Sequence, residues 1–306
     1  MRWSDIVEER RQAKLADEVL RAQALASDGK ASLVFMGTGA ACGVPTFYCG
    51  CKACEEARVN PRARRTCCSI ALVGTGLGPG GDAPVTLIDA CPDVHAQLAR
   101  EGIEDVERVL FTHEHFDHVG GVPQLELYVR LKRKEPLPFY CNEQTLAHIA
   151  EHDAFMADTF DLRPLALGET LAFGGISYTP IAATHCPGCF GYLIEVSPEA
   201  SRTGRSVRIA YLPDTAYPCP ETFYAIEGAD ILIVDATFNA GNWMPTQHLS
   251  IDKAIELADE LGVGHCYLTH LSMQFDEPIT LEELDAKLAA HGTRTTAAYD
   301  GLRIDL

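Results

Sequence analysis

The chain has 306 residues, 47% of them hydrophobic, and a formal net charge of −18 at pH 7. This length and apolar fraction are sufficient for one large domain with a buried core. The strong negative charge makes a polyanion such as RNA a poor partner, because nucleic-acid binding depends on neutralising phosphates. A small phosphate ester is not excluded, since bound metal ions supply local positive charge.

Export and membrane insertion are both disfavoured by the sequence. No run of 18 apolar residues is present, so we expect no transmembrane segment and no membrane partner. The first ten residues are charged and lack the apolar core of a signal peptide. In such a chain, twelve cysteines indicate reduced thiols and metal ligation rather than a disulfide framework. We therefore expect a cytoplasmic protein.

Residues 4–27 carry apolar side chains at near-helical spacing among many charges, which predicts a helix. We treat residues 1–30 as an N-terminal helical extension and residues 31–306 as one domain. The extension either packs on this domain or forms a homodimer contact, and the sequence leaves both open. Residues 31–36 are predicted to form an apolar strand. The glycines of the following turn, 37–39, either line a pocket or simply turn the chain.

Three cysteines, Cys49, Cys51 and Cys54, lie within six residues and are called the cysteine cluster below. Three thiols at this spacing form a compact metal-binding group, and we expect a structural zinc there. A set of buried or redox-active thiols is the alternative.

The segment His113-Glu-His115-Phe-Asp117-His118 places four metal-ligand side chains directly after an apolar run, 106–112. Imidazole and carboxylate groups suit zinc, manganese and iron. His113 and His115 point the same way if the segment is extended, and Asp117 and His118 follow where the loop turns. One ion does not easily use all four groups, so the motif predicts two ions side by side.

Three further candidate ligands each follow a strand-like segment: His185 after 181–184, Asp214 after 207–212 and His270 after 265–269. Strand ends converge at one edge of a layered fold, where functional sites collect. One such residue alone is usually a cap or a loop residue, but several in one chain indicate a shared site. Cys186-Pro-Gly-Cys189 follows His185 directly, and metal binding, redox cycling or a tight turn all remain open for it.

The remaining segments complete the expected order of elements. Residues 85–88 are predicted to form a strand that a flexible hairpin connection, 75–84, joins to the preceding one. Residues 122–133 and 249–261 have helical patterns, and 197–206 is a polar turn between strands. The end of the chain, 295–306, is predicted to form two short strands around Asp300-Gly301, a pair typical of a type I′ turn.

Together these motifs resemble the metallo-β-lactamase superfamily over residues 31–306. The resemblance implies an α/β fold, a four-layer αββα sandwich of two mixed sheets flanked by helices. It implies two divalent ions, Mn or Zn, with Asp117 counted as a catalytic residue as well as a ligand. The implied ligands are His113, His115 and His185 for one ion, Asp117, His118 and His270 for the other, and Asp214 as the bridge between them.

Residues 37–45 with the cysteine cluster, and Leu212-Pro-Asp-Thr215, resemble the phosphoribosyl 1,2-cyclic phosphate phosphodiesterases of the carbon–phosphorus lyase pathway. That resemblance implies hydrolysis of a small cyclic phosphate ester by a hydroxide that the two ions share. It also implies that His248 is a general acid or a phosphate contact, unless it is a solvated residue before a helix. Met273 departs from the family pattern, because the family has there the histidine that completes the structural zinc site.

Three arginines, Arg62, Arg64 and Arg65, are candidates for contacting a distal phosphate, although a solvated basic turn is the more economical interpretation. Residues 65–70, 92–98 and 299–304 also resemble PQQ-biosynthesis protein B. That family shares the cysteine cluster but has a degenerate histidine motif, whereas this chain keeps every dinuclear ligand. Hydrolysis is therefore favoured over the alternatives, another ester or lactone hydrolase and a non-enzymatic accessory protein.

Overall fold

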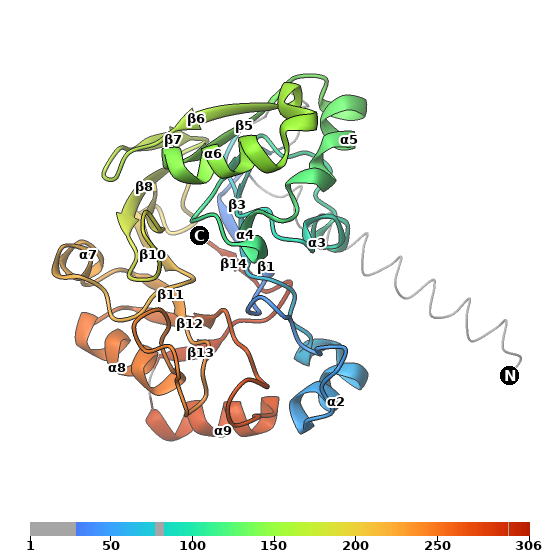
Figure 1. Cartoon of the computed structure of the whole chain (residues 1–306). Helices are drawn as coiled ribbons and strands as arrows, with labels where there is room; N and C mark the ends of the chain where they lie inside the picture. The colour runs from blue at the N-terminus through green and yellow to red at the C-terminus, as the bar shows by residue number, and fades with distance from the viewer. Residues whose placement is uncertain (1–28, 77–82, 293) are drawn as a thin grey trace, which may run out of the picture.

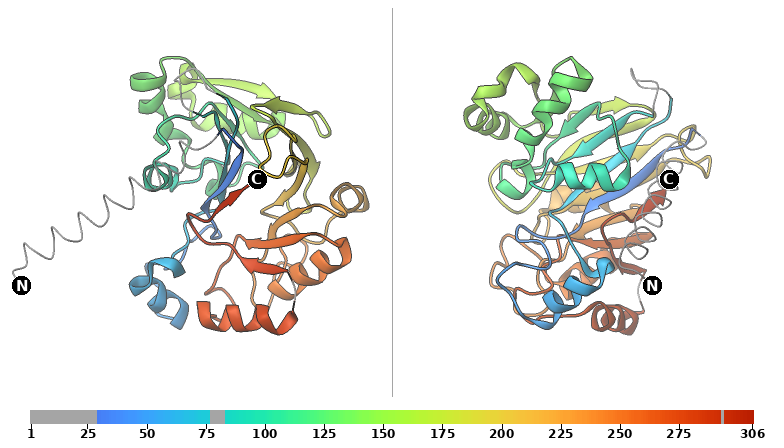
Figure 2. Two further views of the ribbon diagram at one scale, coloured as in Figure 1. Left: turned by 180° about the vertical axis from the view of Figure 1, so that it is seen from behind. Right: turned by 90° about the vertical axis from the view of Figure 1, so that its right-hand side faces the viewer.

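Two seven-stranded sheets pack face to face, with helices on both outer surfaces (Figures 1 and 2). The computed structural model describes residues 29–76, 83–292 and 294–306. The predicted N-terminal helix over residues 4–27 lies outside these ranges. The αββα sandwich expected from the sequence is thus the observed architecture. None of the helices in the described ranges has both the length and the apolarity needed to cross a membrane.

The first sheet has the strand order β14-β1-β2-β3-β4-β5-β6. Its first four strands pair antiparallel, whereas β3 to β6 run parallel to one another. The strands are β1 (Ser32–Gly37), β2 (Ser69–Val73), β3 (Val85–Ile88), β4 (Arg108–Leu110), β5 (Leu137–Cys141), β6 (Phe160–Pro164) and β14 (Arg303–Asp305).

The second sheet mirrors this plan with the order β13-β12-β11-β10-β9-β8-β7. Strands β10 to β13 are parallel, and β7 to β10 pair antiparallel. The strands are β7 (Leu171–Phe173), β8 (Ile176–Ala182), β9 (Phe190–Val196), β10 (Val207–Leu212), β11 (Ile231–Asp235), β12 (His265–Thr269) and β13 (Thr295–Ala297).

Helices α3 and α6 pack against the first sheet, and α7, α8 and α9 against the second (Figure 1). Ser250 caps α8 at its start, and Gly262 in the left-handed region ends it. The helices are α2 (Lys52–Val59), η1 (Pro61–Ala63), α3 (Val94–Glu101), α4 (Phe116–Val119), η2 (Val122–Leu125), α5 (Glu126–Tyr128), η3 (Val129–Arg133), α6 (Glu143–His152), η4 (Ala154–Thr159), α7 (Pro220–Ile226), α8 (Ile251–Leu261) and α9 (Leu281–His291).

Alternating side chains of the strands fill two apolar layers. In β10, Ile209 and Tyr211 belong to the core between the sheets, whereas Ala210 and Leu212 belong to the core under α7, α8 and α9. A sheet buried on both faces needs apolar residues at successive positions, which explains why its strands read as continuous apolar runs. Strands β3, β4, β10, β11 and β12 are parallel to a neighbour, so their carboxyl ends deliver residues to a common edge.

Most predicted elements occur close to their expected bounds, with two differences. The helical pattern over 122–133 forms three short pieces, η2, α5 and the π-helix η3, rather than one helix. The two short strands expected around Asp300-Gly301 are present as β13 and β14, but the tight turn expected between them is wrong, because β13 pairs with β12 in one sheet and β14 pairs with β1 in the other. Gly301 has φ +86° but Asp300 does not have the positive φ that a type I′ turn requires.

Candidate metal centre

The histidine motif lies where β4 ends at the edge of the first sheet. β4 ends at Leu110, His115 has the extended φ and ψ of −63° and 146°, and the short helix α4 begins at Phe116. The His118 N–H donates to the His115 carbonyl at 2.9 Å and closes this turn. The turn places the His118 ring 4.3 Å from that of His113, with Asp117 on the side of His118 and His270, and all three residues of the motif are buried.

The predicted ligands of the dinuclear site converge in the structure, and we call them the His/Asp cluster. Asp214 lies at the middle, with Oδ2 2.9 Å from His118 Nε2 and Oδ1 3.2 Å from His270 Nε2. The ligand atoms gather within 4.8 Å of one another in overlapping groups. These groups include His113, His115 and His185; His113, His118 and Asp214; and Asp117, His118 and His270.

Several buried atoms of the His/Asp cluster face one another without hydrogen bonds. His113 Nε2, His118 Nε2 and Asp214 Oδ2 are all fully buried and have no hydrogen-bond partner within the described part of the chain. Buried polar atoms are normally paired, and orphaned imidazole nitrogens beside a carboxylate oxygen form a suitable donor set for a divalent cation. The residues present therefore fit the metal ions that the sequence motif implies.

Asp89, at the end of β3, supports the first histidines from behind. Its Oδ2 accepts a hydrogen bond from His118 Nδ1 at 2.8 Å, and Thr112 donates its backbone N–H to Oδ1 at 2.8 Å. The Thr112 hydroxyl also lies within hydrogen-bond distance of Asp89 and 3.0 Å from His113 Nδ1. Because Nδ1 of each ring is occupied in this way, Nε2 is the atom presented to the cluster.

Asp235, the last residue of β11, makes the corresponding hydrogen bonds in the second sheet. The Thr237 hydroxyl donates to Asp235 Oδ1 at 2.9 Å and lies 2.8 Å from His270 Nδ1. His185 Nδ1 lies 3.0 Å from the Gln247 carbonyl. Sequence reasoning did not assign a role to Asp89, Asp235 or these threonines. Their position at strand ends is the feature that would have indicated it.

Opposing charges set the protonation of the cluster. Burial lowers the pKa of His118, but Asp214, Asp89 and Asp117 outweigh this effect and hold the pKa well above its ordinary value. Burial likewise raises the pKa of Asp214, yet His270 and His118 hold it well below its usual range. The pKa of His270 rises to about 8, because the neighbouring carboxylates outweigh burial. Positive charge is thus favoured at His118 and His270, whereas burial lowers the pKa of His113 and His185.

His248 lies against the His/Asp cluster and is not a solvated residue, since only 8% of it is exposed. Its Nδ1 is 2.6 Å from Asp235 Oδ2, and its ring stacks on that of His270 at a centroid distance of 5.3 Å. The Asn242 side chain donates to the His248 carbonyl at 2.8 Å, which fixes the backbone. The ring therefore has an anchored Nδ1 edge and an Nε2 edge that has no hydrogen-bond partner in the described residues.

Comparisons with known proteins agree with this geometry. Residues 86–271 match the model of the β-lactamase superfamily domain. The chain belongs to this superfamily. Its fold and its His/Asp cluster are those of a metallo-β-lactamase-fold metal hydrolase.

Several relatives cover nearly the whole chain. Coenzyme PQQ synthesis protein B of Methylorubrum extorquens is 26% identical over 318 residues, covering 90% of this chain and 99% of the relative. Among solved structures, a diphosphatase of the PhnP family has a TM-score of 0.74 at 24% identity, covering 90% of this chain and 98% of its own. Zinc-bound PqqB from Methylobacterium extorquens has a TM-score of 0.73 at 24% identity, covering 90% and 100%. The two structures establish the fold that this chain shares with them.

The cysteine cluster is a separate group at the start of α2. The Sγ atoms of Cys49, Cys51 and Cys54 lie within 4.8 Å of one another. Burial raises the pKa of Cys54 to about 11, whereas hydrogen bonds from Cys51 lower that of Cys49. Met273 is buried in the same apolar core as Cys54. Within the described ranges the group contains three ligands and no fourth histidine, cysteine or carboxylate.

Arg65 corrects the interpretation of the three arginines as a solvated basic turn. It is 2% exposed, and its Nη1 donates to the Thr38 hydroxyl at 2.8 Å and to the Ala298 carbonyl. The Thr38 carbonyl in turn accepts the N–H of Leu271 at 2.9 Å, next to the ligand His270. The glycine turn at residues 37–39 therefore supports a ligand-bearing strand end. A Cβ on Gly37 would collide with the Cys67 carbonyl, which explains the glycine.

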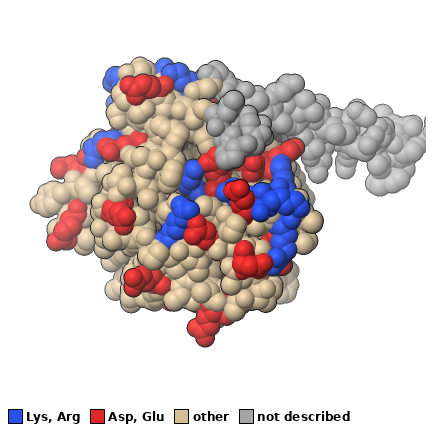
Figure 3. All heavy atoms as spheres, turned by 90° about the horizontal axis from the view of Figure 1, so that it is seen from above, with Lys and Arg blue, Asp and Glu red and all other residues tan. Residues whose placement is uncertain are grey.

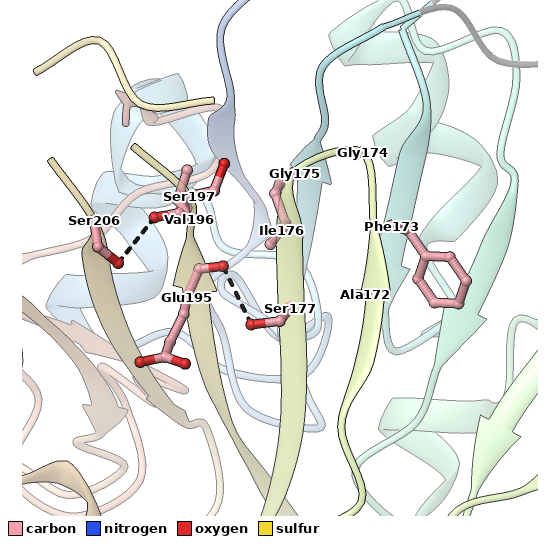
Figure 4. Close-up of a pocket in the computed structure, with 10 residues that line it drawn as sticks. All are labelled: Ala172, Phe173, Gly174, Gly175, Ile176, Ser177, Glu195, Val196, Ser197 and Ser206. Atoms are coloured by element: carbon pink, nitrogen blue, oxygen red, sulfur yellow. Dashed lines mark hydrogen bonds between the residues drawn. The ribbon is translucent and has the colours of Figure 1, made fainter. Parts of the chain in front are cut away.

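A cavity of about 330 Å³ lies at the far ends of the strands from the His/Asp cluster (Figure 4). It is bordered by the β7–β8 turn at Gly174 and by Ser206, where β10 begins, whereas His185 and Asp214 follow the other ends of β8 and β10. Ser177 and Ser206 donate to the carbonyls of Glu195 and Val196. Glu195 is the one charged side chain among the described residues drawn there, so this cavity has no metal-ligand set.

Proposed function

We propose that the protein is a dinuclear-metal phosphodiesterase that hydrolyses a small cyclic phosphate ester, with phosphoribosyl 1,2-cyclic phosphate as the expected substrate. One observation carries this proposal: the complete set of dinuclear ligands gathers around Asp214 beside a fixed His248. Members of this superfamily that have lost ligands cannot use two ions in the same way. Two divalent ions held there would polarise the phosphoryl group and supply an activated water.

The chain's own residues divide the remaining work. His113, His115 and His185 would hold one ion, and Asp117, His118 and His270 would hold the other. Asp214 lies between the two groups and would be their shared ligand. Asp89 and Asp235 orient the imidazoles from behind, so the donor atoms are already in place before an ion binds.

His248 is proposed to protonate the leaving oxygen of the substrate. Asp235 anchors Nδ1, which presents Nε2 to the pocket as the proton-carrying atom. The ring lies close to the ligands without being one of the predicted dinuclear set. A proton donor beside the ions is needed because the alkoxide of a sugar is a poor leaving group.

The surface supports a small substrate rather than a nucleic acid. Arg130 pairs with Asp158 at 2.9 Å, and Lys132 pairs with Glu104 at 3.3 Å, so these basic side chains are already matched by acidic ones. Figure 3 likewise shows acidic and basic side chains next to one another on the face seen from above. With a net charge of −18, the protein offers little to a polyanion outside its metal centre.

The cysteine cluster is proposed to hold a structural zinc apart from the catalytic pair. Three thiols within one turn suit zinc, which prefers four ligands in such sites. Met273 stands at the position of the family's histidine, and a thioether is a poor zinc ligand. A water, or a residue of a second subunit, is the proposed fourth ligand.

A non-enzymatic accessory role is the second candidate, favoured by the 26% identity with Coenzyme PQQ synthesis protein B over nearly the whole chain. Hydrolysis of another ester or a lactone is the alternative within enzymes. The discriminating experiment measures metal content after purification without added metal, then turnover of a panel of cyclic phosphodiesters, esters and lactones. Turnover of a phosphodiester supports the first proposal. Full metal loading without turnover of any substrate would refute it in favour of the accessory role.

A further inference from the structure

Cys186 lies within the first group of the His/Asp cluster. Its Sγ and the ligand atoms of His113, His115 and His185 are all within 4.8 Å of one another. We propose that the Cys186 thiolate is a further protein ligand, beside the bridging Asp214, of the ion that these three histidines would hold. This inference rests on the proposed metal centre, but not on the identity of the substrate.

The local backbone fixes the position of this thiol. The Cys189 N–H donates to the Cys186 carbonyl at 3.1 Å, so the CxxC segment forms a tight turn. Gly188 has φ +75°, and its carbonyl accepts a hydrogen bond from the Asn142 side chain at 2.7 Å. Asn142 also caps α6, which ties the turn to the first sheet's helical layer. Cys186 is therefore the first residue of a turn that hydrogen bonds hold in place, and it directly follows His185 in the chain.

A second observation indicates that an ion belongs in this group. His113 is 1% exposed and its Nε2 has no hydrogen-bond partner in the described residues, although Nδ1 is engaged by Thr112. Imidazole nitrogens and a thiolate sulfur are both donors that zinc accepts, so Cys186 matches the histidines beside it. When the ion binds, the thiol loses its proton to solvent and the sulfur forms the bond to the metal, so no oxidant or reductant is needed.

This ligand would make the two metal sites chemically unequal. The group with Cys186 offers three imidazoles and a soft thiolate, whereas Asp117, His118 and His270 offer imidazoles and a carboxylate. Thiolate selects zinc over manganese, while carboxylate suits manganese. The chain would therefore prefer zinc at the first position more strongly than a site of histidines and carboxylates alone.

The first test uses cobalt(II) as a spectroscopic probe in the full-length protein purified under reducing conditions. Wild-type, Cys186→Ser and Cys219→Ser chains are stripped of metal and reloaded with cobalt. The cysteine cluster contributes equally to all three spectra, so the difference between wild type and Cys186→Ser isolates one thiolate. We expect a sulfur-to-cobalt charge-transfer band in that difference and none for Cys219→Ser. A difference spectrum without the band would overturn the proposal.

The second test begins with the wild-type chain, so its alkylation measurement does not depend on how the variants fold. Alkylation of Cys186 by iodoacetamide is followed by peptide mass spectrometry with and without zinc. We expect zinc to protect Cys186 but not Cys219, and Cys186→Ser to lower zinc affinity at this site by at least about tenfold. Equal alkylation in a chain with full zinc content would refute this inference alone. Unchanged metal content in Asp214→Ala would instead refute the dinuclear centre itself.

Discussion

Replacing His248 with alanine should slow hydrolysis while leaving both metal ions in place. The imidazole is buried, its Nδ1 is 2.6 Å from Asp235 Oδ2, and it contacts the ligand His270 by ring stacking. Loss of a positioned general acid costs about 10²–10⁴-fold in rate. That range corresponds to about 2.7–5.4 kcal/mol of transition-state stabilisation.

The same substitution has a structural cost that must be measured separately. Without the imidazole, Asp235 Oδ2 keeps the Thr215 N–H at 3.2 Å but loses its short partner. Leaving a buried acceptor under-satisfied costs about 1–3 kcal/mol of folding stability. A fall in Tm is therefore expected, and activities must be expressed per folded, metal-loaded molecule.

The decisive assay measures kcat/KM of His248→Ala on two substrates that differ in their leaving groups. A cyclic phosphodiester with a sugar alkoxide leaving group should lose the full factor in kcat/KM, whereas a nitrophenyl phosphodiester should lose much less, because its leaving group needs no proton. Asp235→Asn is the matched positioning variant. With the cyclic phosphodiester, it should alter the pH profile in the same direction as His248→Ala does. Equal losses on both substrates of His248→Ala would refute the general-acid role and leave a binding role.

Three further substitutions probe the metal sites. Asp214→Ala should remove the bridge and abolish activity in a folded chain. Full metal content of this variant by elemental analysis would contradict the bridging role. Asp89→Asn should lower metal affinity about 10–100-fold by weakening the hold on His118, measured by competition with a chelator, and unchanged affinity would count against the supporting role. Cys51→Ser should remove about one zinc and lower Tm with near-normal activity per folded molecule, and an unchanged metal count would mean that the thiols are free.

That these residues gather at one place could be predicted from the sequence, because His113, His185, Asp214 and His270 each come at or near the end of an apolar run. His185, Asp214 and His270 needed no knowledge of tertiary contacts beyond the rule that parallel strands end at one edge. Asp89 and Asp235 also end strands, yet their roles depend on which histidine lies across from them, and strand order alone determines that. Sequence patterns report the position of a residue along its own strand. They do not report its partner on the next.

The C-terminal segment shows the opposite difficulty, a local pattern overruled by distant contacts. Asp300-Gly301 favours a tight hairpin, but the Asp300 carboxylate accepts hydrogen bonds from the Thr38 hydroxyl at 2.8 Å and from the Thr66 N–H at 2.8 Å. These bonds hold the connection at the junction of the two sheets. The strands on either side then pair with β12 and β1, each of which provides a free edge. Asp300 is a residue type that suits a turn, but here its carboxylate holds the connection between the two strands in place.

The two halves of the centre follow one plan. In the first sheet Asp89 binds Thr112 and His118, and Thr112 contacts His113. In the second sheet an aspartate, a threonine and two histidines repeat this pattern.

Asp235 binds Thr237 and His248, and Thr237 contacts His270. His248 thus occupies in the second half the place that the predicted metal ligand His118 occupies in the first. The difference lies in their neighbours: His118 Nε2 is 2.9 Å from Asp214, whereas the nearer His248 nitrogen to Asp214 is the anchored Nδ1, at 3.8 Å. A histidine held like a ligand, but with its Nε2 left outside the central carboxylate's reach, is suited to carry a proton to the substrate rather than to hold an ion.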